Sequence, residues 1–141
     1  MKQLKSWLLC AALTLGTGWA AAQDIAPAQV ASAGADVIKI LDESRYGELW
    51  NGASLVIKQL FPRAQFGVDL AKIRQPFGAP SARTWVSLSH GQLNADQGQL
   101  AGEYANVEYE TRFAKGEVKR ELVSFRLDTD KVWRFAGYAL R

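Results

Sequence analysis

The sequence predicts an α+β domain in which N-terminal helices pack on a curved antiparallel sheet of about four strands. Apolar residues recur at helical spacing in the first half of the chain, and after Ala82 they alternate with polar residues as in half-buried strands. Short turns separate the alternating segments, which is typical of antiparallel neighbours. Helices first and an antiparallel meander second therefore place the helices on one face of the sheet.

Residues 1–22 are predicted to be a secretory signal peptide. They comprise a basic start, an apolar run and an ending in small residues, the pattern that a signal peptidase requires. The expected cleavage lies between Ala22 and Gln23 and leaves one α+β domain, residues 23–141. The protein is therefore expected to be exported, either to a periplasm or out of the cell.

The predicted cleavage also changes the composition of the chain. Lys2 and Lys5 leave with the signal peptide, so fifteen Lys and Arg residues remain against fourteen Asp and Glu residues. A charge this close to neutral gives no support for a nucleic-acid partner. Cys10, the one cysteine, is lost too, so no disulfide is expected. The apolar run is shorter than the roughly 20 residues of a membrane span, so no stable membrane anchor is expected.

The first helix is predicted to begin at Pro27, because the fixed φ angle of proline suits the first helical position. One face of this helix is polar and includes Asp42, which is followed by a polar turn. The other face is apolar and consists of Val30, Gly34, Val37, Ile38 and Leu41.

Two further helical segments follow. A short helix covers residues 46–53, and the next begins after Ser54, a candidate N-cap. Pro62 interrupts this third segment because proline cannot continue the helical hydrogen bonds. Helical spacing then resumes from Phe66 and ends near Phe77.

The second half of the chain is predicted to form strands. Their expected spans are 85–93, 104–113, 123–127 and 132–140. Lys115-Gly116 and the polar stretch 128–131 are predicted turns between them. In the second strand the alternation assigns an inward set that consists of Ala105, Val107, Tyr109, Thr111 and Phe113.

Several short motifs resemble those of a known family. They are Arg74-x-Pro76-x-Gly78, Arg83-Thr84, Tyr109-x-Thr111-Arg112-Phe113-Ala114 and Trp133-Arg134-x-Ala136-Gly137-Tyr138. In this order they resemble the small exported bacterial family called domain of unknown function 4019, over residues 30–141. The resemblance implies export and a helix-then-sheet fold, but no activity. The element order also resembles the cystatin-like cone of the nuclear-transport-factor-2-like superfamily, which implies a bent sheet around a helix.

The sequence contains no motif for common enzymatic or metal chemistry. His90 is the only histidine, which excludes a site with several imidazole ligands. Asp128-x-Asp130 is too short for a calcium loop and is predicted to be a solvated turn. Ser89 and His90 point to opposite faces of a strand, so they cannot form a nucleophile–base pair. No cofactor is expected.

One face of the second strand carries candidate site residues. Glu108 or Glu110 would act as a general base if this face lined a cavity, and Arg112 would hold a ligand carboxylate. The alternative is that this face is exposed to solvent, as is common in antiparallel sheets. The candidate ligand-binding residues are Arg112, His90, Tyr138 and Trp85.

Three functions remain open from the sequence. The leading hypothesis is an exported, soluble domain that binds a small molecule or a protein partner and performs no chemistry. The first alternative is a cavity enzyme that uses a carboxylate base. The second is a structural domain that forms homodimers through the exposed face of its sheet.

Overall fold

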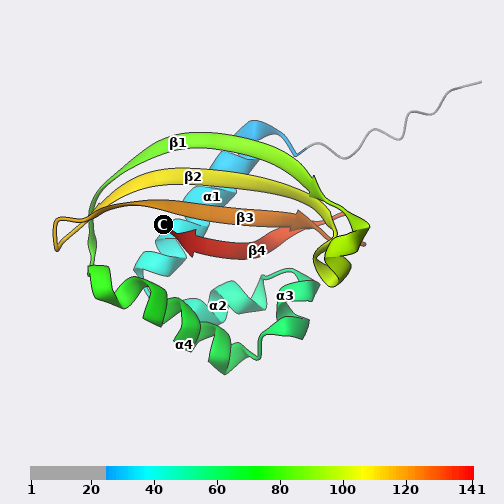
Figure 1. The fold of residues 1–141 in the computed structure, drawn as a ribbon, viewed down its shortest axis with the longest axis horizontal. Coiled ribbons are helices and arrows are strands. Elements are labelled where there is room, and N and C mark those ends of the chain that lie inside the picture. The colour runs from blue at the N-terminus through cyan, green and yellow to red at the C-terminus, as the bar shows by residue number, and fades with distance from the viewer. Residues whose placement is uncertain (1–24) are drawn as a thin grey trace, which may run out of the picture.

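The computed structural model describes residues 25–141 as four α-helices, two short 3₁₀ helices and a four-stranded antiparallel sheet (Figure 1). The elements are α1 (Pro27–Asp42), α2 (Tyr46–Asn51), α3 (Leu55–Leu60), α4 (Arg63–Arg74), η1 (Gln75–Phe77), β1 (Pro80–Leu93), η2 (Ala95–Leu100), β2 (Gly102–Phe113), β3 (Val118–Leu127) and β4 (Trp133–Leu140). The predicted α+β fold is confirmed. The predicted signal peptide and the cleavage site between Ala22 and Gln23 lie outside the described residues.

The sheet is an open meander in the order β1-β2-β3-β4, and each strand is antiparallel to its neighbour. The strands curve together across the molecule, with β1 and β4 at the two edges (Figure 1). The predicted turn between β2 and β3 contains Gly116, whose φ of 91° suits glycine. β1 begins earlier than predicted, at Pro80, and its register shifts between Trp85 and Ser87.

Helix α1 lies against one face of the sheet, as expected from its apolar stripe (Figure 1). The helix lies close to the sheet at Gly34, where a side chain would meet Val107 at 2.9 Å and the Tyr109 hydroxyl at 2.7 Å. The inward set predicted for β2 is buried throughout. The core joins this set to apolar residues of the helices and of β3 and β4, among them Leu41, Leu49, Phe66, Leu70, Val123, Phe125 and Phe135.

Pro62 separates α3 from α4, as the sequence predicts. Ser54 occupies the N-cap position of α3, as predicted, but its hydroxyl makes no cap hydrogen bond. It donates instead to the Asp128 carboxylate, and the second oxygen of that carboxylate accepts from the Leu55 backbone N–H. A side chain from a distant turn therefore takes over the capping of α3.

In the described part of the chain, no helix combines the length and the apolar composition needed to cross a membrane.

Candidate functional site

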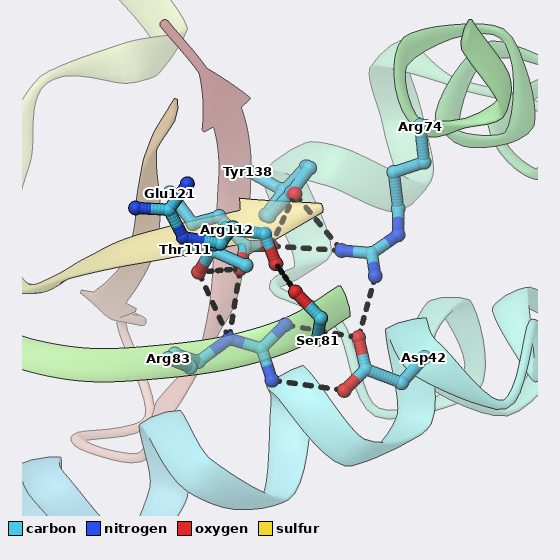
Figure 2. A network of polar contacts seen from close by, with 8 residues as sticks. All are labelled: Asp42, Arg74, Ser81, Arg83, Thr111, Arg112, Glu121 and Tyr138. Carbon is cyan, nitrogen blue, oxygen red and sulfur yellow. Dashed lines mark hydrogen bonds and ion pairs between the residues drawn. The ribbon is translucent and has the colours of Figure 1, made fainter. Parts of the chain in front are cut away.

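Glu121 on β3 is the centre of a buried group of charges at one end of the sheet (Figure 2). Its side chain has no solvent exposure and faces two guanidinium groups. Arg74 at the end of α4 donates to one carboxylate oxygen from 2.8 Å, and Arg83 on β1 donates to the other from 2.8 Å. Because both partners of a buried ion pair lose their water, this close pairing is needed to keep the charges inside the protein.

Asp42, the last residue of α1, connects the same two arginines from their other side. Arg83 forms a bidentate ion pair with the Asp42 carboxylate, at 2.9 and 3.0 Å, and Arg74 donates to one of the same oxygens. Asp42 lies on the polar face of α1, as predicted, and its side chain is 25% exposed. We call Asp42, Arg74, Arg83, Thr111, Glu121 and Tyr138 the charge cluster.

Two hydroxyl groups complete the hydrogen bonding of Glu121. Thr111 on β2 and Tyr138 on β4 each donate to one of its oxygens. Each hydroxyl also accepts from an arginine: Thr111 from Arg83 at 3.1 Å, and Tyr138 from Arg74 at 2.9 Å. The charge cluster thus joins α1, α4 and all four strands.

Two members of the charge cluster, Arg74 and Tyr138, have raised pKa values. Burial and the neighbouring Glu121 carboxylate raise the pKa of Tyr138 far above its ordinary value, so its hydroxyl remains a donor. Burial disfavours the charge of Arg74, but Tyr138, Glu121 and Asp42 outweigh this and raise its pKa. Both Arg74 and Tyr138 therefore keep their protons, and neither is suited to proton transfer.

A second buried carboxylate lies at the turn between β3 and β4. Asp128 is 2% exposed, so the predicted solvated turn is wrong at this residue. It accepts from Ser54 at 2.6 Å, from Arg126 at 2.9 Å and from Arg134 at 3.0 Å. Burial by itself raises the pKa of Asp128, but these hydrogen bonds and that from Leu55 outweigh burial and lower it. The arrangement fixes the turn to the start of α3.

An apolar groove of about 340 Å³ runs between α3, α4 and β4. Phe66 and Phe135 are buried in it, with ring centroids 6.1 Å apart in an edge-to-face arrangement. Its exposed apolar residues are between 38% and 43% exposed and are Leu60, Phe61, Ile73 and Leu100. Among the described residues that line it, Asp69 is the one with a charge. Large apolar side chains beside one another and open to water are typical of a binding surface.

The family model described as protein of unknown function, DUF4019, matches residues 33–138. The chain belongs to the DUF4019 family. The matched segment spans the charge cluster from Asp42 to Tyr138, and the resemblance predicted from the motifs is confirmed. No curated protein was found to match the chain.

The structure brings several motif residues of this DUF4019 member together. Arg74, Arg83, Thr111 and Tyr138 come from four separate motifs and all contact one another or Glu121. Tyr138, a candidate ligand-binding residue, also lines the apolar groove. The motifs contain these four residues, but they did not indicate Asp42 or Glu121 or show which residues meet.

The candidate bases Glu108 and Glu110 lie on the outer face of the sheet, away from the helices. Arg120 of β3 contacts them from 3.9 and 3.3 Å. Arg112 is exposed on the same face of β2. None of these three belongs to the charge cluster or lines the groove.

The remaining candidates lie on β1. His90 is near Glu103, with 3.7 Å between Nε2 and the carboxylate, and its ring lies 5.9 Å from that of Trp133. His90 lines a separate cleft of about 370 Å³ beside the start of α1. Trp85 is 53% exposed. Within residues 25–141, no group of His, Cys, Asp and Glu side chains is arranged to hold a metal ion.

Proposed function

We propose that this DUF4019 protein is an exported, non-enzymatic binding domain that holds an apolar part of its ligand in the groove between α3, α4 and β4. The observation that carries the proposal is the exposure of four large apolar side chains around a buried aromatic floor. Burial of such residues by a ligand is favourable because it removes apolar surface from water.

The arrangement of the charges also favours binding over catalysis. Every carboxylate oxygen of Glu121 and Asp128 accepts hydrogen bonds from the protein itself. A general base needs an oxygen that is open to its substrate. Glu108 and Glu110 lie on the outer face, where Arg120 contacts both. The enzyme alternative therefore has less support than binding in the groove.

Export forms part of the proposal and has its own test. The basic start, apolar run and small-residue ending of residues 1–22 support it. Mass spectrometry of the protein from the exported fraction is expected to give Gln23 as the first residue. An intact Met1 in exported material would contradict the signal peptide.

The cystatin-like cone belongs to the same proposal. It is supported by the curved sheet and by α1, which lies across one face of it (Figure 1).

Binding of the apolar dye Nile red tests the groove. Fluorescence titration of the purified protein is expected to show saturable binding that Ile73→Glu weakens at least about fivefold, because a charge then faces the apolar floor. Val68→Glu is the matched control, since Val68 is an exposed apolar residue of α4 that does not line the groove. Equal loss in both variants, or no saturable binding, would reject the proposed function.

A further inference from the structure

One wall of the groove is the edge of β4. Phe135 to Tyr138, four consecutive residues, line the groove, whereas one face of a regular strand would contribute only every second side chain. The register with β3 shifts between Ser124 and Phe125, so Ala136 is an extra residue of β4 at this point. Gly137 shows that the strand's backbone also forms part of this wall. A side chain at Gly137 would point to Ser124 on the outer face, 3.8 Å from its Cβ, so the backbone of Gly137 is what borders the groove.

The hydrogen-bonding pattern of β4 shows which backbone groups face outward. Arg120 and Arg141 exchange both backbone hydrogen bonds, at 2.7 and 2.9 Å. In an antiparallel pair of strands, residues that direct their N–H and C=O groups toward the neighbouring strand alternate with residues that direct them away. Tyr138 and Leu140, opposite Val123 and Glu121, belong to the second kind, so their N–H and C=O groups point away from β3. Among the described residues, no strand of the sheet lies beyond β4.

One segment of the chain already pairs with this edge of β4. Ala53 forms a parallel bridge with Phe135, and the Ser54 N–H donates to the Phe135 carbonyl at 2.7 Å. The chain then turns away into α3, and the groove begins there. Extended backbone therefore fits against this edge at one end of the groove.

We propose that the groove receives an extended segment of a partner protein, which adds to β4 as a further strand and places alternate apolar side chains against Phe66 and Phe135. The inference rests on the proposed function and names the class of ligand. A small apolar molecule would contact the same side chains but leave the outward N–H and C=O groups of β4 without a protein partner. Asp69 on the groove wall favours a basic residue within the segment.

The probe is a pool of fluorescein-labelled peptides of about eight residues that alternate Val, Ile, Leu or Phe with Ser, and contain one Lys. The control pool has the same sequences with alternate backbone nitrogens methylated, which keeps the side chains but removes the hydrogen-bond donors of one edge. Fluorescence anisotropy with the full purified protein is expected to show binding of the first pool and at least about tenfold weaker binding of the second.

Two protein variants and their two matched controls locate the binding. Ile73→Glu is expected to weaken peptide binding about tenfold, whereas Val68→Glu on the same helix leaves it unchanged. Leu140→Pro removes an outward N–H of β4, so it is expected to weaken peptide binding but leave Nile red binding intact. Leu140→Ala controls for the loss of the side chain, and circular dichroism confirms that each variant is folded.

The outcomes separate the two proposals. If Nile red binds in the groove and the peptides do not, the inference is overturned and the proposed function stands. Equal binding of the methylated pool would also overturn it, because the edge of β4 would then have no part. A concentration-dependent dimer that Leu140→Pro abolishes would replace the partner segment by a second copy of this chain. If neither dye nor peptide binds, both proposals fail.

Discussion

The inner and outer faces of the sheet carry similar ion pairs in different surroundings. On the inner face, Glu121 is fully buried and lies 2.8 Å from two arginines. On the outer face, the Glu110 side chain is 49% exposed and lies 3.3 Å from Arg120. Water screens the outer pair, while the inner carboxylate depends entirely on its protein partners. Surroundings, more than the charges themselves, therefore decide what each pair contributes to stability.

The largest expected effect comes from removing the central charge. Glu121→Gln is expected to lower the free energy of unfolding by about 3–5 kcal/mol, because Arg74 and Arg83 then lose a buried counter-charge. Urea denaturation at neutral pH measures the change. A loss below about 1 kcal/mol would show that the inner and outer pairs are equivalent.

The Asp128 site tests whether a second buried carboxylate behaves in the same way. Asp128→Asn is expected to reduce stability by about 2–3 kcal/mol, since two arginines and the Ser54 hydroxyl bond to the charged form. The lowered pKa of Asp128 gives stability that is present above about pH 4 and lost as the pH falls through the lowered value. The variant should therefore lose less stability in acid than the native protein.

Asp130 is the control for this pH dependence. It pairs with Arg134 at 2.7 Å, but its side chain is 47% exposed. Asp130→Asn is expected to change the acid denaturation curve less than Asp128→Asn does. An equal change would contradict the special role of the buried carboxylate.

A smaller effect is expected from one hydroxyl of the charge cluster. Tyr138→Phe keeps the ring but removes a donor to Glu121 and an acceptor for Arg74, so about 1–2 kcal/mol of stability should be lost. Thermal denaturation at neutral pH measures it. Because Tyr138 also lines the groove, Nile red titration of the same variant shows whether binding survives the loss of the hydroxyl. An unchanged melting temperature would place Tyr138 outside the stabilising network.

The smallest effect is expected on the outer face. Glu110→Gln should change stability by less than about 1 kcal/mol, and added salt should remove most of the difference. Denaturation curves at low and high salt provide the measurement. A large effect that persists in salt would show that solvent does not screen this face, and would reopen the candidate roles of Glu108 and Glu110.

Part of the charge cluster could be predicted from sequence patterns. The inward set of β3 contains Val123 and Phe125, and the same alternation places Glu121 on the inner face. Asp42 gave no such signal, because it lies where the apolar stripe of α1 ends and a polar turn begins. Asp128 was predicted to be exposed because turn residues usually are, and its burial depends on partners brought from α3 and β4.

The groove, too, could be predicted from the sequence only in part. Helical spacing predicted the segment from Phe66 onward and the break at Pro62, and both are confirmed. Which residues of α4 remain exposed depends on where β4 and η2 lie. Ile73 is 38% exposed and lines the same groove as Leu100, a residue that lies in a different element and far along the chain.

The sequence by itself determined the order of helices and strands, the inward face of β2 and the family, because these depend on local periodicity and short motifs. Only the tertiary structure decided which charges pair and where the groove lies. Arg74 and Glu121 are 47 positions apart, and Ser54 and Asp128 are 74 positions apart. Such contacts form only when packing of the apolar faces brings distant segments together, and local sequence patterns carry no information about that meeting.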